Sequence, residues 1–402
     1  MLVTVALRGL LRNRRRTIVS LATMAIGSAA LFLFQGFNTG LLNEYRNNAI
    51  HAHYGNGQVN TRGYREKILA RPWEAWIAEP QSVLDSLRNI SGVSHVFPRL
   101  EVAGLISNGT RSLGARGMGI DGRSESSFFN TINVIHGKSL NDTPDGIVLG
   151  KGLAESMDLK VGDRVTLLAN TVYGSLNGAD LFVSGIFHTG SRELDDSFFQ
   201  IQIEQAQQLL DTDKIEKISI GLAQHEDWPR VSQLIEQLPY VLEATPFEIL
   251  DKIYYQNSVD FLNAIYSLVG FVIIFVVVLG VFNTSTSSIL ERTQEIGMLR
   301  ANGESKRDIF ALIACEGLIA SVVGALIGIF AIVFLNALFL QDGFYMPPGP
   351  GITRSFKTFI ALDVGMGFES LMLIVVAGVS GAVLAVLKVV RTSIALTLRH
   401  VG

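Results

Sequence analysis

Cysteine is almost absent from this chain, and charged residues are scarce. The single cysteine among 402 residues is Cys315, so no disulfide can form within the chain. Charged side chains make up only 17% of the residues and apolar ones 48%, and the mean hydropathy is positive. This composition excludes an ordinary soluble protein, and the charges that are present exclude a chain embedded in lipid throughout. We therefore expect one lipid-embedded part and one soluble part.

Four long apolar runs predict four transmembrane helices. Each run is close to or longer than the ~20 residues that a helix needs to cross ~30 Å of hydrocarbon. The predicted spans are residues 17–39, 259–283, 309–340 and 367–388. The fourth has an uncharged run of only about seventeen residues, and Lys388 could extend its side chain toward the headgroups. The first run exceeds the ~7–15 residues of a signal-peptide core, so we expect it to remain as a span.

Basic residues near the spans predict the orientation of the chain. Twelve Lys and Arg side chains lie in three segments, the N-terminal amphipathic segment 1–16, the loop 284–308 and the C-terminal residues 388–402. The loop 341–366 carries only Arg354 and Lys357. Because cytoplasmic loops carry the excess of Lys and Arg, segments 1–16, 284–308 and 389–402 are expected in the cytoplasm. Both termini then lie inside, and the loop 341–366 lies outside together with the large insertion 40–258.

The insertion 40–258 is predicted to be a large α/β domain between the first two spans. It holds no cysteine, so its core must form without a disulfide. Its 19 basic and 27 acidic residues argue against nucleic acid as a partner. Alternation of strands and helices predicts a split β-α-β subdomain, and the Gly-rich region of about 111–200, with its short strands, predicts a small β-rich subdomain.

The loop between the second and third spans has the pattern of a short amphipathic helix. In ILERTQEIGMLRANGESKRDIF, from Ile289 to Phe310, apolar residues recur at helical spacing with charged residues around them. Gly303 suits a helix end that needs positive φ, and Ser305 with Asp308 gives a weaker form of the capping box for the next helix. An ordered helix is therefore favoured over a loop that is charged only because it faces the cytoplasm. Its expected docking residues are Glu291, Arg292, Glu295, Ile296, Leu299 and Arg300.

Several stretches resemble one family of transporters. ERTQEIGMLRANGESKRDI is similar to the signature of the FtsX/MacB-type ABC transporter permeases (type VII), and EGLIASVVGALIG is similar to their third span. ALRGLLRNRRRTIVSLATMAIGSAALFLFQGF resembles their N-terminal helix and first span, and GIVLGKGLAESMDLKVGDRVTLL resembles the small β subdomain of their MacB-like periplasmic core. The architecture is most similar to that of the lipoprotein-releasing permeases LolC and LolE. At the C-terminus the chain departs from the family, since Ser393 stands where proline is usual and Thr397 precedes Leu398.

The resemblance implies partners and a location. It implies a helix that docks into a cytoplasmic ABC ATPase subunit, present in two copies, which would bind ATP and Mg while this chain binds no cofactor. It also implies a second permease, either a copy or a paralogue, contact with membrane lipid, and a place in the bacterial inner membrane. A lipoprotein or a periplasmic adaptor is a further implied partner, and the substrate-binding residues are unknown.

No catalytic constellation is evident in the sequence. The stretch GIVLGKG lacks the glycine spacing of a phosphate loop and the Ser or Thr that follows its lysine. His51 and His53 lack a third ligand at a telling spacing, so we expect no metal site. His188 and the Asp195–Asp196 pair are interpreted as structural residues. We therefore expect a non-catalytic subunit.

The predicted spans contain one acidic residue and two rows of small residues. Glu316 lies about two turns into the third span, where a charge is costly, so it is either functional or hydrogen-bonded within the bundle. Small residues four apart permit close helix contact, and we expect these rows to join the third and fourth spans while the first two face a partner permease. The rows are Ala320, Gly324 and Gly328, and Ala377, Gly381 and Ala385.

Two functions remain open at this stage. In the first, the chain is half of a transporter that extracts lipoproteins or another amphiphile from the outer leaflet. In the second, which is the FtsX-like alternative of mechanotransmission, it transports nothing and transmits force to a periplasmic partner such as a cell-wall hydrolase or an efflux adaptor.

Overall fold

A computed structural model describes residues 4, 6, 8, 10, 12, 14–67, 71–125, 127–129, 132–292, 296–298, 303–347 and 355–390. The chain divides into two compact units. The helical unit comprises Met1–Asn43, Ser258–Phe344 and Lys357–Gly402, and the α/β unit comprises Glu44–Asn257 and Tyr345–Phe356. Of the predicted docking residues, Glu295, Leu299 and Arg300 lie outside the described residues, as does the C-terminal stretch with Ser393.

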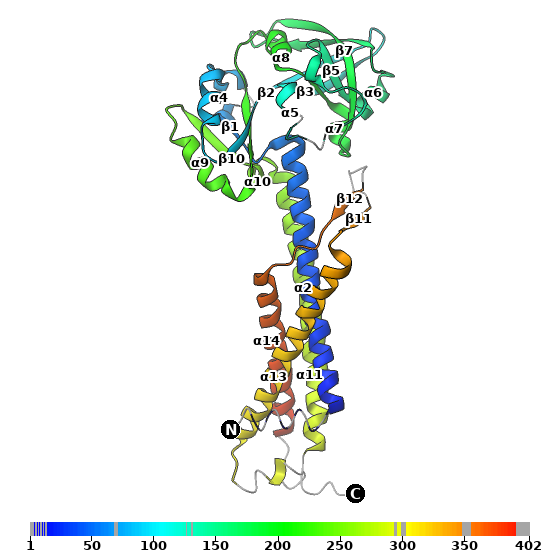
Figure 1. Cartoon of the computed structure of the whole chain (residues 1–402), viewed down its shortest axis with the longest axis vertical. Coiled ribbons are helices and arrows are strands. Elements are labelled where there is room, and N and C mark those ends of the chain that lie inside the picture. Colours follow the sequence, from blue (N-terminus) through cyan, green and yellow to red (C-terminus); the bar gives the residue numbers. More distant parts are fainter. Residues whose placement is uncertain are drawn as a thin grey trace. The chain divides into compact units, whose positions relative to one another are not determined.

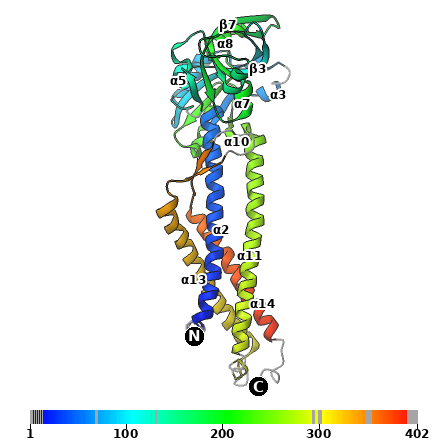
Figure 2. The same cartoon turned by 90° about the vertical axis from the view of Figure 1, so that its right-hand side faces the viewer.

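Four long helices dominate the described part of the helical unit and lie alongside one another (Figures 1 and 2). They are α2 (Arg14–Ala49, in this unit as far as Asn43), α11 (Asn257–Glu291), α13 (Lys306–Leu335, continued by a π-helical turn to Leu340) and α14 (Val364–Val390). All four are long and apolar enough to cross a membrane. The chain is therefore a multi-pass membrane protein.

The turn before α13 has the chemistry that the sequence predicts. Gly303 has a φ of +97°, a conformation that costs a residue with a Cβ more than it costs glycine. The Ser305 hydroxyl accepts a hydrogen bond from the Asp308 amide at 3.3 Å, and the Asp308 carboxylate accepts one from the Ser305 amide at 3.0 Å. The predicted capping box is thus confirmed, and it fixes the residue at which α13 begins.

The α/β unit is built on one sheet. Among its described residues, ten strands pair in the order β10-β1-β9-β2-β3-β8-β5-β7-β4, with β6 paired to β2 and β7. The strands are β1 (Gly57–Thr61), β2 (Val93–Ser107), β3 (Ser112–Ile120), β4 (Asn133–Gly137), β5 (Gly146–Gly150), β6 (Arg164–Asn170), β7 (Leu176–His188), β8 (Phe198–Gln202), β9 (Lys217–Leu222) and β10 (Leu242–Pro246). A separate ribbon pairs β11 (Phe344–Met346) with β12 (Phe356–Thr358).

Short helices connect these strands. They are α3 (Tyr64–Lys67), α4 (Pro80–Arg88), α5 (Gly122–Glu125), α6 (Lys151–Ser156), α7 (Arg192–Ser197), α8 (Ile203–Leu210), α9 (Trp228–Glu236) and α10 (Phe247–Leu250). Each of α4, α8 and α9 has an apolar face that is buried, as expected for helices that cover a sheet. The predicted α/β domain between the first two spans is thereby confirmed.

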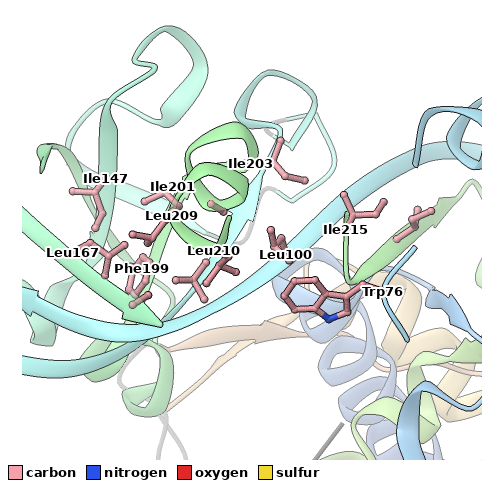
Figure 3. Close-up of a cluster of buried hydrophobic side chains, with 14 of the residues drawn as sticks. Trp76, Leu100, Ile147, Leu167, Phe199, Ile201, Ile203, Leu209, Leu210 and Ile215 are labelled. Carbon is pink, nitrogen blue, oxygen red and sulfur yellow. The ribbon is translucent and has the colours of Figure 1, made fainter. Parts of the chain in front are cut away.

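The long strand β2 joins the two predicted subdomains. Its first part, Val93–Arg99, pairs with β9, and its second part, Arg99–Ser107, pairs with β3. Its last four residues also pair with β6. One hydrophobic core extends along β2. Figure 3 shows buried side chains of this core from Ile147 to Trp76. The core is continuous across both subdomains, so we expect them to unfold together.

Candidate functional site

The end of α11 is tied to two other spans by ion pairs. Glu291, the last residue of α11, pairs with Arg16 of α2. The next residue, Arg292, donates from one guanidinium nitrogen to both carboxylate oxygens of Glu316 on α13, at 3.1 and 3.4 Å. The side chains of Arg292 and Glu316 are only 22% and 13% exposed. An ion pair with so little solvent contact is costly to break, so it fixes the chain where it leaves the membrane.

Arg292 and Glu316 line a small cavity among α2, α11 and α13. The cavity measures about 90 Å³ and is lined partly by Thr17, Ser20 and Ser288, together with the ion pair. The hydroxyl of Thr284, another lining residue, donates to the carbonyl of Gly280 at 2.7 Å within its own helix. The cavity is therefore lined mainly by apolar side chains, with several hydroxyl groups and one ion pair among them.

Ile296 lies on the inner side of the segment that follows α11. It is half-buried and packs against a cluster of Ile289, Ile309, Ile313, Ala385 and Val386. Residues 296–298 are helical, and the Ile296 amide donates to the Arg292 carbonyl at 2.9 Å. Met298 instead has 59% of its surface exposed. Sequence reasoning missed Met298, although it lies in the same quoted motif two residues after Ile296.

The geometry changes the interpretation of two predicted docking residues. Arg292 is engaged with Glu316, and Ile296 contacts the interior of the helical unit. Each therefore has a structural contact within this chain, and a docking role for either remains a prediction. For Glu316, the structure supplies the hydrogen-bonded partner that one of the two interpretations required.

The rows of small residues lie at helix contacts, but not all at the expected ones. A Cβ on Gly324 would lie 2.7 Å from the Cβ of Met24, and one on Gly328 would collide with the backbone carbonyl of Ala25, both on α2. A Cβ on Gly381 would approach the carbonyl of Val278 on α11 at 2.7 Å. These three glycines therefore contact the first two spans instead of joining the third and fourth, although the third and fourth spans do pack together as expected.

Other residues make the contact between α13 and α14. A Cβ on Gly317 would lie 2.7 Å from the Cβ of Ala382. Ser321 approaches Gly378 closely and donates to the Gly317 carbonyl of its own helix at 2.6 Å. Ala320, Ala377 and Ala385 are buried within the helical unit. Four spans that interlock through glycines form a bundle in which a shift of one helix must move its neighbours.

The histidines singled out from the sequence lie in aromatic or acidic surroundings. The His51 ring lies 4.7 Å from that of Phe128, and the His53 ring lies 5.6 Å from that of Phe198. Within the described ranges, no three His, Cys, Asp or Glu side chains are grouped closely enough to hold a metal. His188 lies 2.7 Å from the buried carboxylate of Asp195, which also accepts from the Thr189 amide.

The α/β unit also holds a buried ion pair that the sequence did not predict. Arg99 on β2 donates to Glu125 on α5 at 2.9 Å, and its guanidinium lies 4.3 Å from the centre of the Phe129 ring. Burial raises the pKa of Glu125 to about 7, although the charge of Arg99 opposes that shift. This pair lies on elements of the domain core, where it stabilises the position of α5.

Family models match most of the chain. The MacB-like periplasmic core domain matches residues 17–238, and the C-terminal FtsX-like permease domain matches residues 267–394. The first match alone covers more than half of the 402 residues. The chain belongs to the FtsX/MacB-type ABC transporter permeases.

Individual relatives of this FtsX/MacB-type permease are distant. It is 22% identical to the lipoprotein-releasing system transmembrane protein LolC of Neisseria meningitidis over 90% of this chain and 88% of that one. It is 27% identical to the uncharacterized ABC transporter permease MJ1507 of Methanocaldococcus jannaschii, over half of this chain and 51% of the relative. The periplasmic region of MacB from Actinobacillus actinomycetemcomitans aligns with a TM-score of 0.38 and 13% identity over 51% of this chain and 94% of that one.

Proposed function

We propose that this permease couples ATP hydrolysis by separate cytoplasmic ATPase subunits to movement of its α/β unit, and that it is not itself catalytic. The observation that carries the proposal is the bracing of the loop between α11 and α13. Arg292 and Glu316 link the loop to α13, and Glu291 and Arg16 link it to α2. A displacement of this loop would therefore move three spans rather than one. An ATPase subunit that displaced this loop would therefore act on all three helices at once.

The proposed assembly follows from the orientation that the basic residues favour. Both termini and the loop 284–308 face the cytoplasm, and the α/β unit faces the periplasm across a bacterial inner membrane. Two ATPase subunits, each with ATP and Mg, would bind beneath two permeases, which are either identical or paralogous. The relation to LolC supports a lipoprotein or another amphiphile of the outer leaflet as substrate.

Met298 provides a sharper test of ATPase docking than Ile296. Because Ile296 packs against the helical unit, Ile296→Asp would disturb folding as well as docking. Met298→Asp places a charge on an exposed position, so we expect the purified permease to keep its melting temperature and to lose at least five-fold in ATPase coupling. The matched control is Val241→Asp in the α/β unit, where the side chain is 66% exposed. ATP hydrolysis and substrate release that stay normal in Met298→Asp would refute docking at this surface.

Copurification distinguishes transport from mechanotransmission. The intact complex would be purified from its native membrane, and its bound proteins and lipids identified by mass spectrometry. An ATPase together with a lipoprotein supports extraction of an amphiphile. An ATPase with a cell-wall hydrolase or an adaptor, and no lipidated protein, would instead support the FtsX-like alternative.

A further inference from the structure

A groove on the α/β unit lies where the turn between β6 and β7 meets α8 and the loop that follows it. Its volume is about 730 Å³, which falls within the ~300–1,000 Å³ range of ligand pockets in proteins. Its lining residues are different from those of the loop between α11 and α13. The proposed ATPase docking and the ion pairs between the spans do not use them.

Two aromatic side chains line the groove and remain accessible. Trp73 is 36% exposed, and Tyr173, at the turn between β6 and β7, is 79% exposed. Rings of this size are usually buried or in contact with a partner, because leaving them in water forgoes a large hydrophobic gain. Their π faces also attract cations, and tryptophan does so most strongly.

The polar groups of the groove are mostly acceptors. Three carboxylates, those of Glu204, Asp211 and Asp213, line it against the single ammonium group of Lys214. The side-chain amide of Gln207 donates to the carbonyls of Asp213 and Lys214, at 3.0 and 3.3 Å, so its donors are used to hold the loop. A groove with a net negative charge and an excess of acceptors suits a ligand that offers only donors, as guanidinium and ammonium groups do.

The base of the groove is held in place by the core of the domain. Leu209, Leu210 and Ile215 are buried, and the Val172 amide donates to the Leu210 carbonyl at 3.0 Å. The side-chain amide of Asn177 donates to the backbone carbonyls of Gln208 and Leu209, each at 3.1 Å. These bonds connect the β6–β7 turn and the start of β7 to α8, so this side of the groove is formed before a ligand arrives and binding requires little ordering.

We propose that this groove binds a lysine- or arginine-bearing segment of a periplasmic polypeptide. A guanidinium or ammonium group would lie against Trp73 and Tyr173 while the carboxylates of Glu204, Asp211 and Asp213 neutralise its charge. An acidic peptide would be repelled by the same carboxylates. A neutral saccharide could stack on the two rings but would leave the charge of the groove unbalanced.

Binding of a fluorescently labelled hexa-arginine peptide to the full-length permease tests the proposal. The permease would be held in nanodiscs of zwitterionic phosphatidylcholine, so that the lipid itself does not attract the peptide. We expect saturable binding that weakens at least five-fold between 50 and 300 mM salt. Asp211→Asn with Asp213→Asn, and separately Trp73→Ala, should each weaken it at least five-fold. Asparagine tolerates the left-handed conformation of Asp211, where φ is +55°, so the first variant should fold.

Glu236→Gln is the matched control, because Glu236 is an exposed carboxylate at the end of α9 outside the groove. Its affinity for the peptide should equal that of the unmodified permease. Three results would overturn the proposal: no saturable binding at low salt, equal loss in Glu236→Gln and the groove variants, or displacement of the peptide by a neutral chito-oligosaccharide. None of these readouts depends on an ATPase, so their failure would leave the proposed coupling function standing.

Discussion

Removing the charge of Glu316 should loosen the helical unit at one defined place. In Glu316→Gln the side chain keeps its size and one acceptor, but the ion pair with Arg292 becomes a hydrogen bond between a charge and a neutral amide. At 3.1 Å and an effective dielectric constant near 20, the attraction between the two charges is about 5 kcal/mol before desolvation. Desolvation and the remaining solvent contact reduce this, so we expect a loss of about 1–2 kcal/mol in the free energy of local opening.

Cys315 provides the assay, because it is the single cysteine of the chain and precedes Glu316 directly. The residue is only partly exposed, so a maleimide reagent should label it mainly when the helix ends open. A loss of 1–2 kcal/mol should raise the rate of labelling about 5- to 30-fold. Arg292→Gln should give a similar rise, and the double variant should be no faster than either single one, since both remove the same interaction.

Arg307→Gln is the control, because Arg307 is an exposed arginine in the first turn of α13. It should leave the rate of labelling of Cys315 unchanged. The reasoning would be refuted if the effects of Arg292→Gln and Glu316→Gln simply added, because the two side chains would then act independently.

Three further outcomes follow from the packing and charges of the two units. Gly328→Ala should reduce the yield of monodisperse protein on size-exclusion chromatography, because the added Cβ would collide with the Ala25 carbonyl. Gly270→Ala is the control and should be tolerated, since the nearest atom to a Cβ at that position lies 3.7 Å away. Phe199→Ala should cost the α/β unit about 3–5 kcal/mol in unfolding free energy, measured by tryptophan fluorescence. Burial raises the pKa of Asp251 from 3.8 to about 6, so the folded domain retains a proton that the unfolded chain releases. This group should therefore lower the unfolding free energy by about 1–2 kcal/mol as the pH rises from 4 to 7, and Asp251→Asn should shrink the total decrease by that amount, leaving the part that the raised pKa of Glu125 contributes.

Features set by neighbouring residues could be predicted from the sequence. The four spans follow from the length of apolar runs, and the start of α13 follows from Gly303, Ser305 and Asp308 because all of its hydrogen bonds join residues within four positions. The α/β class of the insertion likewise follows from the alternation of its strands and helices. Each of these features depends on residues close together in the sequence, so the sequence alone is enough to predict it.

Pairings between distant residues could not be predicted in the same way. The four-residue spacing of small residues identified Gly324, Gly328 and Gly381 as contact residues, but such spacing does not say which helix lies opposite. Their neighbours proved to be α2 and α11. Arg292 and Glu316 were each singled out, yet their pairing depends on how α11 and α13 are placed in the bundle. In the same way, alternation shows that β2 is a strand without showing that its two halves have different partners.

These contacts give the helical segment at 296–298 two distinct faces. Ile296 packs against a cluster with members on α11, α13 and α14, whereas Met298 has most of its surface exposed. Arg292, which precedes this segment, is held to Glu316 of α13. An inward force on Met298 would pass through Ile296 to α13, and from α13 through Gly324 and Gly328 to α2. Under the proposed coupling, an ATPase subunit that pushes on Met298 would move α13 and α2 as long as the Arg292–Glu316 pair stays closed.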